Sequence, residues 1–214
     1  MSPASPSDTN PSATPDATIS EEERSRSAQV GAVLFRHRGW LPVPFLFIPL
    51  LFAGRMEAWN WIIGFVLIAI GEAIRLAGVA AAGTVTRRRS RTVQRLVTYG
   101  IFSWMRNPLY VGNFLIWIGF TVISGVLWFI PVAIVLFAVE YTLIVRYEEG
   151  VLESIFGAEY LEYKSRTPRW IPRPPAVHES GEHHWGEAWR SELSTFMQYA
   201  VLTAAFAVKQ AYGW

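Results

Sequence analysis

The stretch that decides the fold begins at the polar cluster Arg106-Asn107-Pro108-Leu109-Tyr110 and closes at a second cluster, Arg146-Tyr147-Glu148-Glu149. The residues between them are mostly apolar and are interrupted near the middle by Ser124-Gly125. Two helices joined at this break would cross a bilayer and return. Both polar clusters would then meet at one face of the membrane, and we expect the active site at that meeting point.

The composition of the whole chain favours a membrane protein. Of the 214 residues, 51% are hydrophobic and only 17% are charged, whereas an ordinary soluble domain carries about 25% charged residues. The sequence contains no cysteine, which excludes disulfides, thiolate nucleophiles and cysteine-based zinc sites. We therefore expect an all-α, polytopic integral membrane bundle of four to five transmembrane helices, with its site on the cytoplasmic side.

Three regions are expected along the chain. Residues 1–25 are predicted to be a disordered tail, because Ser, Pro, Thr and Asp dominate them without apolar periodicity. The core covers residues 26–175. Its four predicted spans are residues 40–54, 58–82, 109–124 and 126–145, with a kink at Pro131, and a cytoplasmic helix follows at residues 148–165. Residues 176–214 are a polar linker and then a helix at 195–211, which either lies along the membrane or, as we favour, spans it.

Basic residues set the expected orientation. Six arginines gather between the second and third spans: Arg87, Arg88, Arg89, Arg91, Arg95 and Arg106. Such a cluster can bind nucleic acid, but beside spanning segments the positive-inside rule favours a cytoplasmic loop. We expect a cytoplasmic (inner) membrane protein with its active site facing the cytoplasm, membrane lipids around it and no nucleic-acid partner.

Charged residues inside the spans have two possible roles. Glu72 and Arg75 share one face of their helix at i, i+3, and Glu140 lies inside the fourth span. Charges at membrane depth face a protein interior or a wet cavity. The pair is therefore either a self-satisfied ion pair or the polar wall of a ligand cavity, and the sequence does not decide between them. Three histidines in the linker, His178, His183 and His184, have no matching acidic pattern, so we expect no metal site.

The two clusters that flank the hairpin carry groups suited to a charged, water-soluble reagent. Glu148 and Glu149 can accept hydrogen bonds from ribose hydroxyls or hold an ammonium or sulfonium charge. Arg166 and Arg169 can grip a carboxylate or phosphate. Asn107 places a side-chain amide at a helix start. Each of these signals alone is also typical of a helix cap or a solvated face, and it is their meeting at one site that favours function.

The segment from Leu96 to Pro172 resembles the isoprenylcysteine carboxyl methyltransferase family and its relatives, the phospholipid methyltransferases. The order and spacing of five motifs carry the resemblance. They are Gly100-Ile101-Phe102, Arg106-Asn107-Pro108-Leu109-Tyr110-Val111-Gly112, Glu148-Glu149-Gly150-Val151-Leu152, Phe156-Gly157-Ala158-Glu159-Tyr160-Leu161-Glu162-Tyr163 and Arg166-Thr167-Pro168-Arg169-Trp170-Ile171-Pro172. The chain departs from the family where Asn107 replaces a common His, Phe102 replaces a Tyr and Ser103 replaces an Arg.

The resemblance implies an integral membrane methyltransferase that uses S-adenosylmethionine and a lipophilic acceptor. Carried over by position, the cofactor-binding residues would be Gly100, Arg106, Asn107, Pro108, Tyr110, Arg146, Glu148 and Glu149. The acceptor-binding residues would be Arg75, Tyr163, Arg166 and Arg169. Catalysis would rest on Arg106, Glu149 and Glu140.

Two acceptor chemistries and two other functional classes remain open. A carboxylate acceptor, as in isoprenylcysteine, needs no base, whereas a phospholipid amine must first lose a proton to Glu140 or Glu149. The Arg166 and Arg169 pair favours the anionic acceptor. The other classes are a non-enzymatic membrane protein and a membrane reductase that binds a nicotinamide cofactor. No Gly-x-Gly-x-x-Gly fingerprint supports the reductase. The oligomeric state does not follow from the sequence.

Overall fold

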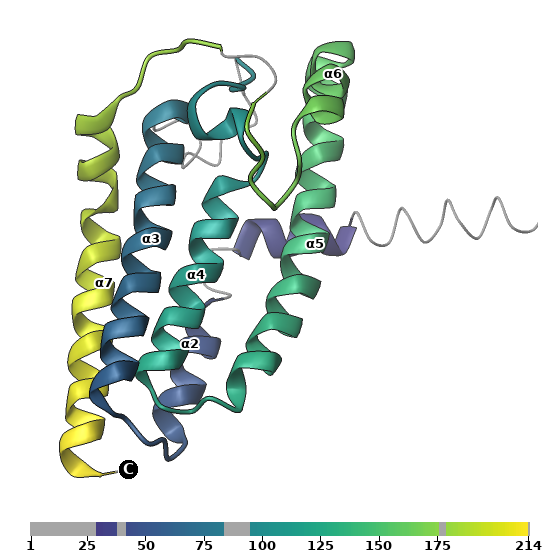
Figure 1. Cartoon of the computed structure of the whole chain (residues 1–214). Coiled ribbons are helices and arrows are strands. Elements are labelled where there is room, and N and C mark those ends of the chain that lie inside the picture. Colours follow the sequence, from purple (N-terminus) through teal and green to yellow (C-terminus); the bar gives the residue numbers. More distant parts are fainter. Residues whose placement is uncertain (1–28, 38–41, 84–94, 176–178, 214) are drawn as a thin grey trace, which may run out of the picture.

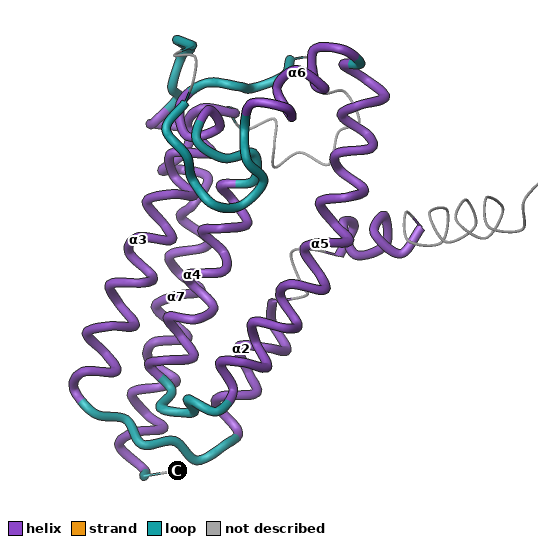
Figure 2. Tube along the Cα trace, turned by 45° about the vertical axis from the view of Figure 1, so that its right-hand side comes forward, coloured by secondary structure: helices purple, strands orange, loops and turns teal. Residues whose placement is uncertain are grey.

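The computed structural model describes residues 29–37, 42–83, 95–175 and 179–213, and every regular element in these ranges is a helix (Figures 1 and 2). A helix over residues 29–37 comes first. It is followed by α2 (Pro42–Leu51), α3 (Ala58–Ala82), the short 3₁₀ helix η2 (Gly100–Ser103), α4 (Pro108–Ile123), α5 (Phe129–Phe156), α6 (Ala158–Arg166) and α7 (Trp185–Tyr212). The all-α prediction is confirmed for the described part of the chain. The predicted tail over residues 1–25, Arg87 to Arg91 of the basic cluster, and His178 lie outside the described residues.

Two helices, α3 and α5, are long and apolar enough to cross a membrane. In each helix, only 39% of the most apolar 18-residue stretch is buried against the rest of the protein, whereas the core helix of a soluble protein would be mostly buried. Large apolar side chains such as Phe65 and Val135 are instead exposed, at 44% and 61%. This exposed apolar surface supports membrane association.

Glycines bring α3 and α4 into close contact. A Cβ atom built on Gly71 would lie 2.6 Å from the carbonyl oxygen of Gly112, and one on Gly64 would lie 2.7 Å from that of Gly119. Backbones can approach this closely only where side chains are absent, which is the usual way that helices associate without a hydrophobic driving force. The α3–α4 pair is therefore the rigid centre of the bundle.

Helix α7 lies against α3 along its whole length, with the opposite chain direction (Figure 1). At one end the backbone N–H of His184 donates to the carbonyl of Ala80 at 2.8 Å. At the other end the indole N–H of Trp61 donates to Gln210 at 3.0 Å. The helix also begins ten residues before the predicted residue 195, because the polar residues from Trp185 onward form its first turns rather than a linker.

The turns opposite the polar clusters are held together by a buried lysine. Lys209 of α7 is only 2% exposed, and its ammonium group donates to the carbonyls of Pro49 at 2.7 Å and Ser124 at 3.4 Å. These carbonyls belong to the C-terminal ends of α2 and α4, where helix dipoles favour a positive charge. Lys209 thus fastens three helices at this end of the bundle.

Two further element boundaries differ from the predictions. Helix α5 runs without a break through residues 145–148, where two separate helices were expected, and the break comes at Gly157, whose φ is +52°. Pro131 lies in the first turn of α5, where a proline removes no helical hydrogen bond. Helix α2 has only ten residues, which is shorter than the predicted span over 40–54.

Candidate functional site

The site lies where α4 and α5 diverge, at the end of the bundle that also carries α6. Helix α5 leans away from α4 there, and the segment after α6 dips into the space between them (Figure 1). The segment covers residues 167–175, and we call it the strap. Its position follows from the break at Gly157, which turns the chain back over the end of α5.

An ion cluster joins the strap to the two predicted polar clusters. Glu149 of α5 is buried, with 5% of its surface exposed, and a guanidinium nitrogen of Arg106 lies 3.1 Å from its carboxylate. Arg169 of the strap binds the same carboxylate with two nitrogens, at 3.0 and 2.6 Å. The structure thus brings together the arginine-asparagine-proline corner and the glutamate pair.

Hydrogen bonds to backbone carbonyls fix the strap and the end of α6 against the start of α4. The N–H of Arg106 donates to the carbonyl of Pro168 at 2.9 Å, and its guanidinium donates to the carbonyl of Lys164 at 2.9 Å. The side-chain amide of Asn107 donates to the carbonyl of Arg169 at 3.2 Å. Asn107 occupies the N-cap position of α4, but its side chain makes no capping bond and serves the strap instead. Pro108 follows it as the buried first residue of the helix.

The two neighbouring glutamates have different environments. The carboxylate of Glu149 is surrounded by arginines, so its acceptor capacity is largely used inside the protein. Glu148 is partly buried and accepts a hydrogen bond from the hydroxyl of Tyr110 at 2.8 Å. Glu148 and Tyr110 therefore form a second polar pair, separate from the contacts of Glu149 with the two arginines.

One buried donor beside the ion cluster has no partner. The Nε of Arg106 is inaccessible to solvent and finds no hydrogen-bond acceptor among the described residues. An unsatisfied buried charged donor carries a free-energy cost that a bound anionic group would remove. A carboxylate next to Arg106 and a hydroxyl or ammonium next to Glu148 would fit this set of groups.

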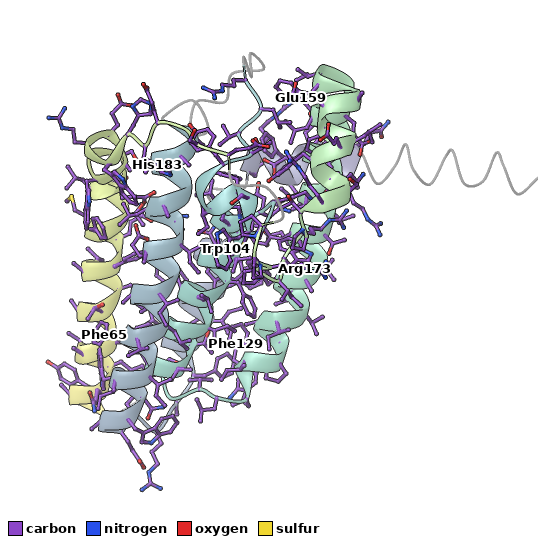
Figure 3. All side chains as sticks on the ribbon, turned by 45° about the horizontal axis from the view of Figure 1, so that its top comes forward. Phe65, Trp104, Phe129, Glu159, Arg173 and His183 are labelled. Atoms are coloured by element: carbon purple, nitrogen blue, oxygen red, sulfur yellow. The ribbon has the colours of Figure 1, made fainter. Side chains whose placement is uncertain are left out.

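An apolar pocket of about 330 Å³ adjoins the ion cluster. Four residues line it: Ile101, Trp104, Met105 and Pro172. Beside the pocket, the N–H of Arg173 donates to the carbonyl of Trp104 at 3.1 Å, and the two residues lie close together (Figure 3). The lining suits a hydrocarbon group rather than a charged one.

Several predicted site residues lie away from this cluster. Arg146 is exposed on the surface of α5. Gly100, with φ of +61°, packs against His183 of the segment that leads into α7. Arg166 pairs with Glu179 in that same segment rather than joining Arg169.

Tyr163 serves to anchor η2. Its hydroxyl donates to the carbonyl of Phe102 at 2.8 Å, and burial raises its pKa well above the ordinary value for a tyrosine. The hydroxyl therefore remains a neutral donor at physiological pH. In this arrangement Tyr163 holds η2, which carries Ile101 of the apolar pocket, rather than the carboxylate of Glu149.

Glu140 lies deep in the bundle. Nine residues separate it from Glu149 on one continuous helix, which corresponds to about 13 Å along the axis. Its side chain is 7% exposed, and its Oε1 atom has no hydrogen-bond partner among the described residues. The structure does not bring Glu140 to the ion cluster.

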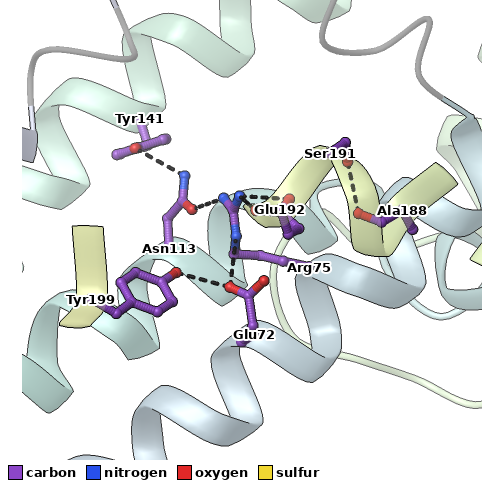
Figure 4. Close-up of polar contacts among 8 residues, drawn as sticks. All are labelled: Glu72, Arg75, Asn113, Tyr141, Ala188, Ser191, Glu192 and Tyr199. Carbon is purple, nitrogen blue, oxygen red and sulfur yellow. Dashed lines mark hydrogen bonds and ion pairs between the residues drawn. The ribbon is translucent and has the colours of Figure 1, made fainter. Parts of the chain in front are cut away.

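Arg75 belongs to a second polar network inside the bundle (Figure 4). Its guanidinium contacts Glu72 at 3.3 Å, Glu192 of α7 at 3.0 Å, and the side-chain oxygen of Asn113. Tyr199 of α7 donates to Glu72 at 2.8 Å. The sequence indicated the Glu72–Arg75 pair, but it gave no signal for the α7 residues because their polar side chains have the spacing of an ordinary exposed face.

His183 and His184 do not form part of either network. His183 stacks on Trp185 and meets the edge of Tyr99, and His184 precedes the first turn of α7. No group of three potential metal ligands occurs among the described residues.

Comparison with known proteins places these features in a family. The sequence model of the phospholipid methyltransferase family matches residues 59–159. The chain is 34% identical over 131 residues to protein-S-isoprenylcysteine O-methyltransferase B of Arabidopsis thaliana, in a match that covers 56% of this chain and 64% of that protein. It is 32% identical over 122 residues to the Homo sapiens protein-S-isoprenylcysteine O-methyltransferase, covering 53% of this chain and 42% of the human protein.

A rice protein extends this comparison. It is described as a probable protein-S-isoprenylcysteine O-methyltransferase of Oryza sativa subsp. indica, and it is 34% identical over 132 residues, with 58% of this chain and 67% of the rice protein covered. The chain thus spans between about two-fifths and two-thirds of the length of these relatives. No solved structure matches it. The chain belongs to the isoprenylcysteine carboxyl methyltransferase family.

Proposed function

We propose that this protein is an S-adenosylmethionine-dependent methyltransferase that acts on a lipophilic acceptor at the cytoplasmic face of a membrane. The observation that carries the proposal is the meeting of Arg106 with Glu149, at 3.1 Å, and of Tyr110 with Glu148, at 2.8 Å, at one end of an apolar bundle. Such a site lies between water, where a charged cofactor is dissolved, and lipid, where an apolar acceptor resides.

The residues present fit the cofactor. S-adenosylmethionine supplies an electrophilic methyl group on a sulfonium sulfur, which needs no acid to activate it. The unpartnered Nε of Arg106 would donate to a carboxylate. Glu148, held by Tyr110, would accept from a hydroxyl or ammonium group. Glu149, saturated by Arg106 and Arg169, would position these groups rather than touch the cofactor.

The acceptor that we favour is a carboxylate on an isoprenylcysteine-like lipid. The similarity to protein-S-isoprenylcysteine O-methyltransferases supports this class. The apolar pocket beside the ion cluster would take part of the hydrocarbon chain, and the exposed Arg173, which follows Pro172 of its lining, would attract the negative end of the acceptor. The protein would contribute alignment of the two reactants and exclusion of water, which together lower a barrier by several kcal/mol.

Amine methylation is the second candidate. It is favoured by Glu140, whose buried Oε1 has no hydrogen-bond partner in the described part of the chain and whose carboxylate would accept a proton from an ammonium group. Against it stands the distance of about 13 Å along α5 between Glu140 and the ion cluster. We therefore place the amine acceptor second.

The membrane arrangement is part of the proposal. Helices α3, α4, α5 and α7 would span the bilayer and the short α2 would enter it. Helix α7 counts as a span because it follows α3 from Ala80 to Trp61. The basic segments beside the site, including Arg95 and Arg173, favour a cytoplasmic position for this end.

Transfer of a labelled methyl group tests the activity and the acceptor class together. Purified protein in lipid vesicles is incubated with methyl-labelled S-adenosylmethionine and either a farnesylcysteine derivative or phosphatidylethanolamine. We expect label in the farnesylcysteine derivative that is released as methanol by mild base, because a methyl ester hydrolyses and an N-methyl group does not. Base-stable label in the phospholipid would instead establish the amine reaction, and no transfer to either acceptor would contradict the proposal.

A further inference from the structure

Helix α7 carries a charge that has no contact with water. Glu192 is 0% exposed, and both of its carboxylate oxygens accept from the Nη2 of Arg75 at 3.0 Å (Figure 4). Burial of an unpaired carboxylate is strongly unfavourable, so Glu192 and Arg75 fix each other's position. Glu192 lies outside residues 59–159, the region that the family model matches.

Arg75, held by Glu192, in turn contacts α4. The aliphatic part of its side chain packs on Gly112 of α4, so that a Cβ atom added to Gly112 would lie 2.5 Å from the Cγ of Arg75. Because Gly112 leaves that space empty, the guanidinium reaches past it and its Nη1 donates to the Oδ1 of Asn113. The last glycine of the Arg106–Gly112 motif therefore admits the arginine.

Asn113 connects the network to the candidate cofactor site. It follows Tyr110 by three residues, so the two side chains share one face of α4. Its amide nitrogen lies 3.4 Å from the hydroxyl of Tyr141, and the ring of Tyr141 packs on that of Tyr110 with centroids 4.7 Å apart. Tyr110 in turn donates to Glu148, so an unbroken series of contacts runs from Glu192 to the site.

A second contact holds α7 in the same register. Tyr199 lies two turns after Glu192 on α7, and its hydroxyl donates to Glu72 at 2.8 Å. Glu72 also accepts from the Nε of Arg75 at 3.3 Å. Both charged residues of α3 are thus bound by α7, and a shift of α7 would disturb the two contacts together.

We propose that Glu192 is a positioning residue for the cofactor site, acting through Arg75 and Asn113 on the tyrosine pair that supports Glu148. The inference rests on the proposed function, because Tyr110 and Glu148 are the residues assigned there to S-adenosylmethionine. It gives α7 a part in the reaction, although α7 contributes no side chain to the site itself.

The test is calorimetric titration of the purified full chain with S-adenosylmethionine. Glu192→Gln removes the charge and keeps the shape, and we expect it to raise the dissociation constant about tenfold. Glu187→Gln is the matched control, because Glu187 is exposed in the first turn of the same helix. We expect that control to bind like the wild type.

Asn113→Leu interrupts the same path at its other end and separates positioning from a general loss of stability. It should also raise the dissociation constant for S-adenosylmethionine. The double variant with Glu192→Gln should have a dissociation constant no higher than that of the single variant that binds more weakly, because both changes interrupt the same series of contacts. Glu192→Asp, which keeps the charge, should recover much of the affinity. If Glu192→Gln does not fold, Asn113→Leu decides alone.

Three results bear on the inference in different ways. Variants that unfold at lower temperature but bind with an unchanged dissociation constant would overturn it, and so would additive losses in the double variant. A wild-type chain that does not bind S-adenosylmethionine would contradict the proposed function itself.

Discussion

Single residues explain why two adjacent glutamates are not equivalent. Glu149 faces into the angle between α4 and the strap, where Arg106 and Arg169 neutralise it. Glu148 precedes it by one residue and therefore points in a different direction from the helix axis, where it accepts a hydrogen bond from Tyr110. The sequence predicted that this pair is important. It could not assign the two roles, because the strap that supplies Arg169 is placed only by the tertiary fold.

Gly112 offers a steric test at the residue scale. In Gly112→Ala the new methyl group would lie 2.6 Å from the carbonyl oxygen of Gly71 and 2.5 Å from Arg75. Backbone cannot yield easily, so we expect a loss of about 1–3 kcal/mol in the free energy of unfolding. Denaturation in detergent, followed by circular dichroism, measures it.

Gly150 provides the matched control. It also lies inside a helix, but an added Cβ would meet nothing within 4 Å. Gly150→Ala should therefore stabilise the protein by about 0.5–1 kcal/mol through the lower entropy of its unfolded chain. Equal effects of the two substitutions would contradict the close packing of α3 on α4.

Lys209 gives a second prediction at this scale. Lys209→Met keeps the apolar stem but leaves the carbonyls of Pro49 and Ser124 without their donor. We expect a loss of about 1–3 kcal/mol, seen as a lower thermal midpoint. Val208→Met, at a neighbouring position that is 52% exposed, should leave the midpoint nearly unchanged, and a similar loss there would remove the specific role of Lys209.

At the scale of elements, the segment from Glu179 to His184 is bound to the rest of the molecule through the carboxylate of Glu179. The Glu179 carboxylate accepts from Thr98 and from Arg166. The hydrogen bond from Thr98, together with the one from Arg166, holds the pKa of Glu179 below its ordinary value of 4.5. This tie connects the start of α7 to the end of α6 and therefore to the strap.

The sign of the pH dependence follows from that shift. Because folding lowers the pKa of Glu179, the tie contributes its full stability above pH 4.5 and loses it as the pH falls through the lowered value. Hydrogen exchange of residues 179–184 should therefore accelerate in acid relative to the rest of the bundle.

Substitution separates this tie from general acid effects. In Glu179→Gln the exchange should already be fast at neutral pH, and Glu182→Gln, in the same segment but exposed, should behave like the wild type. Slow exchange in Glu179→Gln at neutral pH would show that the carboxylate does not hold the segment.

For the whole molecule, the sequence predicted the hairpin and the meeting of its ends, because apolar length and the Ser124-Gly125 break determine both. It also indicated α3 and its Glu72–Arg75 pair. It did not indicate the continuity of α5 through residues 145–148, since charged residues there resemble a boundary and only packing shows that the helix continues. Nor did it indicate Glu192, whose burial depends on how α7 docks onto α3.

The same limit applies to the residues carried over from the family. Gly100 and Arg166 match the motifs in sequence, and Arg146 lies two residues before the motif that begins at Glu148, but all three lie away from the ion cluster. The spacing of a motif determines where a residue lies along its helix. Whether that residue faces the site depends on how the neighbouring elements pack. Arg169 and Asn107 lie at the site because the strap is bonded to the start of α4.

The most direct measurement of the central proposal is the affinity of the purified chain for S-adenosylmethionine, with NADPH as a second ligand that tests the reductase alternative. Tyr110→Phe and Glu148→Gln remove the two partners of one hydrogen bond at the site, and Glu159→Gln on the exposed surface of α6 is the control. We predict binding of S-adenosylmethionine and not of NADPH, weakened about tenfold in the two site variants and unchanged in the control. Absence of binding by the wild type, or equal affinity in all four proteins, would contradict the proposed site.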